Sequence, residues 1–500
     1  MQLNPKFYTF VAFIGGLTIM AIEITAARIM GPYFGTSIFI WTNILGVIML
    51  ALAIGYWLGG KIADKYPVPK VFFTIVLIAS ILILALPFLA PTLLENLSAR
   101  MVEPDSSLII FSLLASLVLF FIPFGLLGMI SPYLIRLVNR QVEQTGRVAG
   151  KIFAVSTIGS IVGTFLPTLV TVPLFGVQRT IVVFGAALCI TAAIGLAKKE
   201  VYIALVVLTA GGLIASPWVL STENTLAYTE SPYSYIEVRD FNGAKALTFS
   251  KNFSIQSLER PNSVLTGGYY WDYFNLLPGV FCQEACDIAI IGVAGGTIAR
   301  QLDYFYADKT ALAIDGIELD PTVTEMARQH FQYDIPSLTT HHSDGRMWLR
   351  LTDRQYDIII LDAFTDVEIP AHLTSNEFFA LAKQQLNEAG VLAINIGVPN
   401  PDVNQYQRFL TTLQNNFDYV WDIGMPSSAN RLVFATDNTI DFPEALRYAN
   451  RPAELDGLFT YAAESLEMPE NYRATLITDD LPLTEMLYDI MLYQGYYKNK

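Results

Sequence analysis

The sequence contains few of the residues that mark disulfide-stapled or metal-binding proteins. Its 500 residues include three cysteines and four histidines. Three cysteines are too few for a disulfide framework, and they form no CxxC motif or Cys/His array of the kind that binds zinc. The histidines His330, His341, His342 and His372 show no metal-ligand spacing. We therefore expect no metal site. Cys282 and Cys286, in "CQEAC", would pair only in an oxidising compartment.

Charged residues are also scarce, at 15% of the chain against 53% hydrophobic residues. Such a composition is typical of a protein with a membrane portion. Residues 1–220 carry 13 Lys and Arg against 7 Asp and Glu, whereas residues 221–500 carry 18 against 38. The acidic second half would repel phosphate backbones, which argues against a nucleic-acid partner. It suits a small cationic partner, although a solvated acidic surface explains the same composition.

The first half contains seven apolar runs that are long enough to cross a bilayer. They lie at roughly 7–30, 38–60, 71–94, 108–135, 152–174, 178–197 and 201–220. We therefore expect a multi-span helical bundle surrounded by membrane lipid in the cell (inner) membrane. The connectors on one side carry ten basic residues, which places the N-terminus in the cytoplasm. Glu23 lies inside the first run, where a carboxylate marks either a functional site or a packing contact with another helix.

The second half changes to alternating strand and helix signals. Residues 231–259 form short alternating stretches broken by Asn-Gly, which predicts a hairpin. Nearly continuous apolar strands separated by helices follow, which predicts a parallel sheet covered on both faces. We expect three regions: a transmembrane domain over 1–220, a small β-rich region over 221–285, and an α/β domain over 286–500.

Glycines and acids occur at the predicted strand ends, where ligands bind in such sheets. Glycines after the first strand allow close backbone approach to a ligand, and an acid after the second can accept hydrogen bonds from ribose hydroxyls. The residues in question are Gly292, Gly295 and Gly296, then Glu318, then Ser343 to Gly345, and finally Asp362. Four such features in order predict a nucleoside site more strongly than a glycine turn alone.

Several motifs in this half resemble those of the spermidine synthase (polyamine aminopropyltransferase) family. They are "GVAGGTIARQL", "GIELDPTVTEMARQHF", "HHSDGRMWL", "YDIIILDAFTDVEIP" and "LTSNEFF". The likeness covers residues 228–435, and the helical half resembles the branch in which a multi-span domain precedes the synthase. The resemblance implies a Rossmann-like, methyltransferase-type fold. It also implies transfer of an aminopropyl group from decarboxylated S-adenosylmethionine to an amine such as putrescine, with release of methylthioadenosine.

The resemblance also assigns roles to individual residues. Glu318 would bind the ribose, and Asp344 with Gly345 would bind the adenine edge, beside the glycine turn. Asp362 would position and deprotonate the attacking amine. The amine site would include the residues Tyr270, Asp272, Asp366, Asp479 and Asp480. For Asp479 and Asp480, in "ITDDLPLTEM", a solvated turn or a helix cap is the competing interpretation.

The sequence also departs from the family pattern. The glycine turn "GVAGG" is one residue shorter than the family's and lacks the acid that meets the cationic tail of the donor. The second acid after Asp362 comes one position late, at Asp366. Tyr-Gln becomes Tyr233-Ser234, and Tyr-His-Glu becomes Tyr270-Trp271-Asp272. These changes remove polar anchors for the tail and the amine while the nucleoside-binding residues remain.

Two alternative functions follow from these departures. One is an S-adenosylmethionine-dependent methyltransferase on the same scaffold. The other is a non-catalytic polyamine-binding transporter or sensor. Two locations are open for the acidic half of the chain. Seven spans place it outside the cytoplasm, whereas a donor made in the cytosol favours the cytoplasmic side. We expect the cytoplasmic side. The acceptor amine and the oligomeric state, a homo-oligomer included, stay open.

Overall fold

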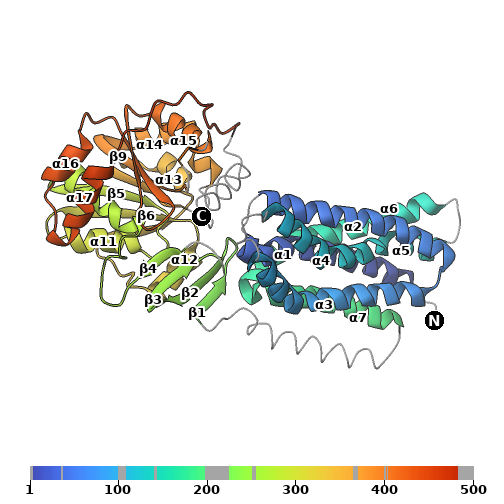
Figure 1. Cartoon of the computed structure of the whole chain (residues 1–500). Helices are drawn as coiled ribbons and strands as arrows, with labels where there is room; N and C mark the ends of the chain where they lie inside the picture. The colour runs from blue at the N-terminus through green and yellow to red at the C-terminus, as the bar shows by residue number, and fades with distance from the viewer. Residues whose placement is uncertain are drawn as a thin grey trace. The chain divides into compact units, whose positions relative to one another are not determined.

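The computed structural model describes residues 4–34, 38–99, 108–139, 144–196, 224–250, 255–363, 370–398, 401–402 and 404–481. The chain divides into two compact units (Figure 1). The helical unit comprises Met1–Glu223 together with Tyr228–Tyr235, and the α/β unit comprises Asn224–Ala227 together with Ile236–Lys500. The boundary near residue 223 lies close to the change in composition, but a short hairpin segment beyond it belongs to the helical unit.

The helical unit is built from long apolar helices. They are α1 (Pro5–Phe34), α2 (Ile38–Lys65), α3 (Pro69–Ala99), α4 (Leu108–Gly128), α5 (Ile130–Val138), α6 (Thr145–Leu166) and α7 (Val172–Leu196), with a π-helical turn at Pro167–Thr171. By length and composition, five helices among the described residues could cross a membrane, not the seven that we predicted. The difference has two sources. Residues 145–196 count as one helical segment, although it is interrupted at Gly176 between two predicted spans, and the run 201–220 lies outside the described residues.

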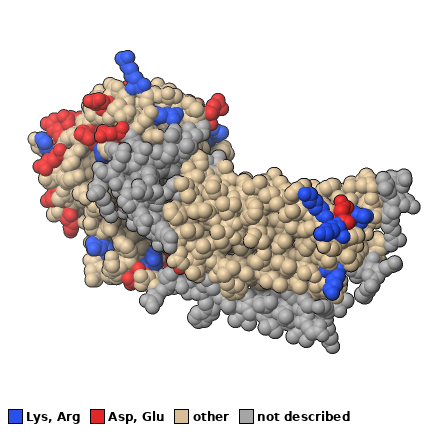
Figure 2. Space-filling model, turned by 45° about the vertical axis from the view of Figure 1, so that its right-hand side comes forward, with Lys and Arg blue, Asp and Glu red and all other residues tan. Residues whose placement is uncertain are grey.

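Glycines allow close contact between helices α1 and α6. A Cβ atom on Gly159 would lie 2.1 Å from the Phe13 carbonyl oxygen, and one on Gly163 would lie 2.2 Å from that of Leu17. Backbone contact through small residues is the usual way in which helices associate in a membrane. The visible surface of this unit is almost free of charged side chains, apart from a cluster near one end (Figure 2). Exposed apolar side chains such as Leu169, at 69%, are part of the unit's surface.

A small antiparallel sheet opens the second half of the chain. Its strands are β1 (Thr225–Glu230), β2 (Tyr235–Phe241), β3 (Ala244–Thr248) and β4 (Ile255–Glu259), in that spatial order. Strands β2 and β3 meet at Asn242-Gly243, where both residues have positive φ, of 55° and 81°. Two consecutive residues with positive φ define the turn that Asn-Gly favours, so the predicted hairpin is confirmed.

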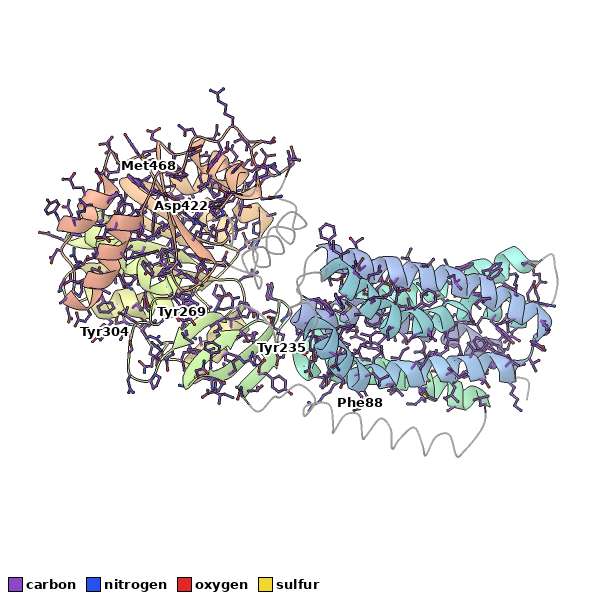
Figure 3. The ribbon with its side chains drawn as sticks, viewed as in Figure 1. Phe88, Tyr235, Tyr269, Tyr304, Asp422 and Met468 are labelled. Atoms are coloured by element: carbon purple, nitrogen blue, oxygen red, sulfur yellow. A yellow bond between two sulfur atoms is a disulfide. The ribbon has the colours of Figure 1, made fainter. Side chains whose placement is uncertain are left out.

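The large sheet has seven strands in the order β10-β11-β9-β8-β5-β6-β7. The strands are β5 (Ala285–Ile291), β6 (Ala311–Glu318), β7 (Leu338–His342), β8 (Tyr356–Leu361), β9 (Leu386–Gly397), β10 (Tyr419–Gly424) and β11 (Asn430–Thr436). Strands β5 to β9 are parallel, whereas β11 is antiparallel to both of its neighbours. The β10–β11 pair is joined by an ion pair from Arg431 to Asp422, with 2.8 Å from Nη2 to Oδ2 (Figure 3). The sheet is therefore mixed, of the Rossmann-like methyltransferase type.

Helices cover both faces of this sheet (Figure 1). Alternate residues of β5 and β8 enter two separate cores: Ile288 and Ile358 belong to one, and Ala289 and Ile359 to the other. The helices are α9 (Tyr270–Tyr273), α10 (Pro278–Phe281), α11 (Thr297–Tyr306), α12 (Pro321–His330), α13 (Gly345–Leu351), α14 (Asn376–Gln384), α15 (Asn404–Gln414), α16 (Phe442–Tyr448) and α17 (Asp456–Ser465). Burial on both faces explains why these strands are nearly continuous apolar runs.

Candidate functional site

The predicted site residues follow the carboxyl ends of neighbouring strands. In the sheet, Ile291 of β5 pairs with Ile317 of β6 on one side and with Leu361 of β8 on the other. The next residues along these strands are Gly292, Glu318 and Asp362, which consequently meet at one edge. This edge is where ligands bind in open α/β sheets.

The glycine turn packs directly against the backbone of Asp362. Gly292 has a φ of +91°, and a Cβ atom on it would lie 2.4 Å from the Asp362 carbonyl oxygen. Gly296 also has a positive φ, +78°, and precedes α11. The amide of Gly295 donates to Ser257 Oγ at 2.7 Å, a contact with β4 that the sequence did not indicate. The glycines therefore fix a turn that no residue with a side chain could form without a shift of Asp362.

Glu318 lies at the end of β6 beside this turn. Its Oε2 accepts a hydrogen bond from the amide of Ala294 at 3.1 Å, and its Oε1 accepts one from the amide of Asp320, also at 3.1 Å. The side chain is 8% exposed, and burial raises the pKa of its carboxyl group. Each oxygen keeps a second lone pair that can accept a ligand hydroxyl.

Asp344 caps the N-terminus of α13, next to β7. Its Oδ1 accepts from the amide of Met347 at 3.0 Å, and its Oδ2 lies 2.8 Å from Nε2 of His372. Gly345 is the first residue of α13, and a Cβ atom on it would lie 2.3 Å from Cγ2 of Ile291. Asp344 and Gly345 thus follow β7, the strand that pairs with β6, which ends at Glu318.

Asp479 and Asp480 have different surroundings from those of an amine anchor. Arg346 of α13 makes a two-pronged contact with Asp479, at 2.7 Å from Nη1 to Oδ1 and from Nη2 to Oδ2. This guanidinium lowers the pKa of Asp479 to about 2. Asp480 is exposed. The structure therefore pairs Asp479 with a cation of the protein itself, and a substrate-binding role for either residue stays a prediction.

Asp362 is the partly buried carboxylate of the site. Its Oδ2 accepts a hydrogen bond from the Tyr270 hydroxyl at 3.2 Å, and its Oδ1 accepts one from Asn395 Nδ2 at 2.8 Å. Burial raises the pKa of Asp362 to about 7, against the opposing effect of hydrogen bonds from Asn395, Tyr270 and Trp271. A carboxylate with a pKa near neutrality can take up a proton at physiological pH, which is the property that a general base needs. Asp366 lies outside the described residues.

Tyr270 and Asp272 both lie on α9, but their side chains make different contacts. The ring of Tyr270 packs on Trp271, with 4.4 Å between centroids, and its hydroxyl faces Asp362. Proximity to Asp362 and burial, with burial the larger effect, raise the pKa of Tyr270 well above its ordinary value. Tyr270 therefore lies beside Asp362, and its role as a wall of the amine site stays a prediction.

Asp272 instead holds a loop of the protein. Its carboxylate accepts five hydrogen bonds: from the amides of Thr266, Gly267 and Gly268, from the Thr266 hydroxyl, and from the side-chain amide of Gln301. Gly267 and Gly268 have φ values of +93° and +90°. A carboxylate offers about four lone-pair sites, so these donors leave it little capacity for an amine. We infer that Asp272 shapes the site indirectly, by fixing the loop that leads into α9.

Sequence reasoning missed the two amides that support Asp362. Asn395 lies in β9 with 1% of its surface exposed, and its Oδ1 accepts from Nδ2 of Asn430, on β11, at 2.9 Å. The available signal was one polar residue within the apolar run "GVLAINIG". Among the residues that the structure describes, no group of three or more His, Cys, Asp or Glu side chains could hold a metal ion.

The fold and the edge of the sheet together define a methyltransferase-type α/β domain with a partly buried acid at the end of its fourth parallel strand along the chain. Residues 270–427 match the family described as the spermine/spermidine synthase domain. The similarity to this domain lies within the α/β unit.

Similar proteins cover different shares of the chain. A probable polyamine aminopropyl transferase of Bifidobacterium longum is 33% identical over 219 residues, which are 43% of this chain and 47% of that protein. A polyamine aminopropyltransferase of Vibrio vulnificus is 27% identical over 292 residues, 55% of this chain and 95% of its own length. The chain thus spans about half of the first relative and nearly all of the second. A crystal structure of a probable spermidine synthase from Corynebacterium glutamicum has a TM-score of 0.39 at 17% identity, over 50% of this chain and 95% of its own.

Proposed function

We propose that this protein is a membrane-embedded polyamine aminopropyltransferase. It transfers the aminopropyl group of decarboxylated S-adenosylmethionine to an amine such as putrescine and releases methylthioadenosine. The observation that carries the proposal is the environment of Asp362, a partly buried carboxylate with a pKa of about 7 beside the glycine turn. The two relatives described above are named for the same activity, which supports it.

Asp362 would act on the attacking amine. An amine reacts only as the free base, so the carboxylate first accepts a proton from the substrate ammonium group. The nitrogen lone pair then forms a bond to the aminopropyl carbon, and the electron pair of the carbon–sulfur bond moves to the sulfonium sulfur. The hydrogen bonds from Tyr270 and Asn395 hold the carboxylate in one orientation throughout.

The donor nucleoside would lie beside β5, β6 and β7. Glu318 fits the ribose because each of its oxygens, although bonded to one backbone amide, can accept a second donor. Asp344 and Gly345 would meet the adenine edge. No residue of the glycine turn is acidic. The charge that attracts the cationic amine would therefore come from Asp362, and Asp366 is the predicted second anchor.

The reaction is tested by product identification. The purified protein would be incubated with decarboxylated S-adenosylmethionine and a set of amines that includes putrescine. We expect methylthioadenosine and the aminopropylated amine in equal amounts, measured by mass spectrometry. The Asp362→Asn variant serves as the control, and nucleoside release that does not depend on any added amine would contradict the proposal.

A second candidate function is a methyltransferase, which one observation favours. The turn from 292 to 296 has Ala294, with a φ of 47°, and lacks the acid that would select a decarboxylated donor. Calorimetric titration with both donors separates the two functions. Tighter binding of the carboxylated donor, by about tenfold or 1.4 kcal/mol, would support the methyltransferase.

The proposed reaction also suggests how the two units lie with respect to the membrane. The helical unit would span the inner membrane, and the α/β unit would face the cytoplasm, where its donor is made. Cys282 and Cys286 are disulfide-bonded in the structure, which would instead suit an oxidising compartment. Two reporter enzymes fused in turn after the α/β unit decide between the two sides. One reporter is active only in the cytoplasm and the other only outside it, so the two fusions give opposite signals.

A further inference from the structure

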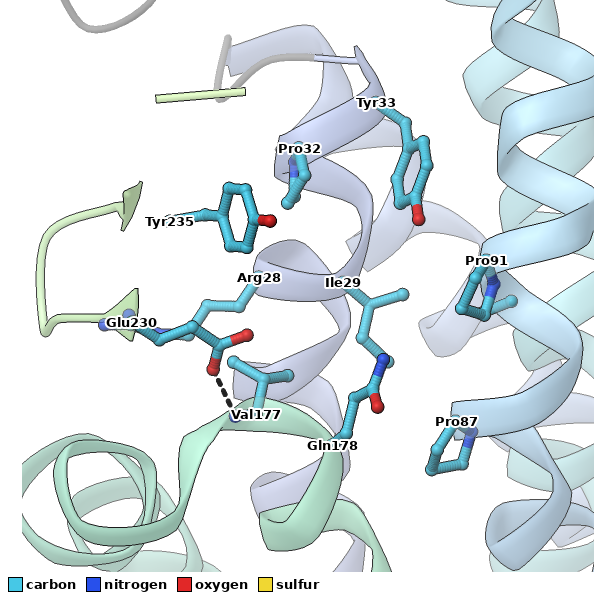
Figure 4. Close-up of a pocket in the computed structure, with 11 residues that line it drawn as sticks. Arg28, Ile29, Pro32, Tyr33, Pro87, Pro91, Val177, Gln178, Glu230 and Tyr235 are labelled. Carbon is cyan, nitrogen blue, oxygen red and sulfur yellow. Dashed lines mark hydrogen bonds between the residues drawn. The ribbon is translucent and has the colours of Figure 1, made fainter. Parts of the chain in front are cut away.

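The helical unit has a pocket of its own, which is lined mostly by apolar residues. Figure 4 shows its wall, which is formed by residues of α1, α3 and α7, by Glu230 at the end of β1 and by Tyr235 at the start of β2. All of these residues belong to the helical unit, because the segment Tyr228–Tyr235 is part of it. The proposed transfer reaction makes no use of this pocket.

A break in helix α7 supplies the first polar group. Gly176 has a φ of +79° and a ψ of 170°, which is not helical. After this break the amide of Val177 donates to Oε2 of Glu230, and a Cβ atom on Gly176 would lie 3.1 Å from that oxygen. One oxygen of Glu230 is therefore held in place at the wall of the pocket. The other oxygen, Oε1, has no hydrogen-bond partner among the described residues.

The nearby cation does not occupy this second oxygen. The guanidinium of Arg28 donates to the main-chain oxygen of Ser231 at 2.8 Å and to that of Pro232. It acts on Glu230 through space, without a hydrogen bond between the two side chains in the described part of the chain. Arg28 thus balances the charge of Glu230 but leaves Oε1 available to a donor.

The second polar group is the side-chain amide of Gln178. This residue lines the pocket and is 8% exposed, and its Oε1 has no hydrogen-bond partner within the residues that the structure describes. A buried amide without a partner destabilises a protein unless a ligand or water satisfies it. Most of the remaining wall is apolar and includes Ile29, Pro32 and Pro87.

We propose that this pocket binds the terminal primary ammonium group of an alkylamine. An ammonium group has three donors and no acceptor, which matches one carboxylate oxygen and one amide oxygen. The space at the centre, about 20 Å³, has room for one water-sized group. The apolar wall suits the methylene chain behind it. The inference is independent of the transfer reaction, although both involve amines.

Equilibrium dialysis of the full-length protein in detergent, with radiolabelled putrescine, tests this site. We expect Gln178→Leu and Glu230→Gln to weaken binding at one site per chain by at least tenfold while turnover changes by less than twofold. Gln178→Leu is the decisive variant, because replacing an unpaired buried amide by an apolar group of similar size preserves folding. Asp64→Asn is the matched control: it removes an exposed acid of α2 that pairs with Arg136 instead.

The outcomes separate this proposal from the proposed function. Folded Gln178→Leu with unchanged stoichiometry and affinity for putrescine would overturn the ammonium site. So would equal competition by 1-butanol, which has the same chain without the charge. Loss of product in Asp362→Asn with retained binding at the helical site would leave the ammonium site supported. If the wild-type protein has no transferase activity and Gln178→Leu still binds one putrescine fewer per chain, only the transferase proposal is overturned.

Discussion

The side-chain amide of Asn395 donates to Asp362, with 2.8 Å from Nδ2 to Oδ1, and is itself held by Asn430 at 2.9 Å. The three side chains come from β9, the end of β8 and β11, so the orientation of the carboxylate depends on strands that are distant in the sequence. Because the donor is neutral, it orients Asp362 without the large fall in pKa that a lysine or arginine would cause.

Removal of the carboxylate should abolish turnover but preserve donor binding. We expect Asp362→Asn to lower kcat by about 100-fold or more, the usual contribution of a general base. The Kd of the donor nucleoside, measured by calorimetry, should change by less than about threefold, because Glu318 is intact. Asp357→Asn, at the opposite end of β8, is the control and should keep near-normal turnover. Equal turnover of Asp362→Asn and wild type would remove Asp362 from the mechanism.

The rate should increase with pH through the pKa of Asp362, about 7. Only the deprotonated carboxylate can accept the amine proton, so kcat/KM falls below this pH. The measurement is a pH–rate profile with saturating donor. A profile that stays flat between pH 6 and 8 would contradict the assigned base.

The same pKa predicts how stability depends on pH. The folded pKa of about 7 lies above the ordinary value of 3.8, so the folded state binds a proton that the unfolded state has released between these values. Stability therefore falls as pH rises through this window, by an amount on the order of 4 kcal/mol at most. Asp362→Asn should unfold at a higher temperature than wild type at pH 8 and at nearly the same temperature at pH 4. Thermal unfolding followed at the two pH values provides the comparison.

Loss of the Asn395 side chain should move the pH–rate profile to higher pH. Its hydrogen bond lowers the pKa of Asp362, so Asn395→Ala removes a stabilising contact of the charged form. Asn430→Ala should give a smaller shift in the same direction. Asn387→Ala is the matched control, because Asn387 bonds to Asp357 at the other end of β8, at 2.6 Å. A shift toward lower pH in Asn395→Ala would refute this positioning role.

Glu318→Gln should weaken donor binding before it affects the chemical step. A hydrogen bond to a charged group contributes about 1.5–3 kcal/mol, so we expect the Kd of methylthioadenosine to rise by about tenfold or more. Glu325→Gln, on the exposed side of α12, is the control, and thermal unfolding checks that Glu318→Gln is folded. An unaltered Kd would argue against contact with the ribose.

Gly292→Ala should destabilise the α/β unit more than Gly243→Ala. Both residues have positive φ, which costs about 1 kcal/mol for a residue with a side chain. A Cβ atom on Gly243 meets open space, whereas one on Gly292 meets the Asp362 backbone at 2.4 Å. The difference in unfolding free energy between the two variants measures the cost of the contact between the Cβ atom at position 292 and the Asp362 backbone. Equal losses would mean that the turn can shift freely.

Residues at the ends of strands could be placed from the sequence, whereas their supporting contacts could not. Gly292, Glu318 and Asp362 end apolar runs, and a parallel sheet brings such ends together whatever the intervening helices are. Asn395 reads as one polar residue in a buried strand. Its relation to Asn430, 35 positions away, depends on an antiparallel strand inserted beside β9.

The span count and Asp272 show two other limits. The sequence has two apolar runs where the structure has one helical segment bent at Gly176, and hydropathy does not record a backbone angle. Asp272 sits in a motif like that of an amine anchor. Its five donors come from a loop whose conformation depends on the positive φ values of Gly267 and Gly268, which its position in the motif does not reveal.

The contact between Val177 and Glu230 limits how the two halves can be separated for study. A break inside an apolar helix exposes an amide that surrounding lipid could not satisfy, so its acceptor must come from the protein. That acceptor lies beyond residue 223, in the segment that composition alone assigns to the other half. A chain cut at 220 would lose it, whereas one that ends after Tyr235 would keep it. The minimal fragment that contains the complete helical unit therefore includes the turn between β1 and β2, in what the sequence presents as the next domain.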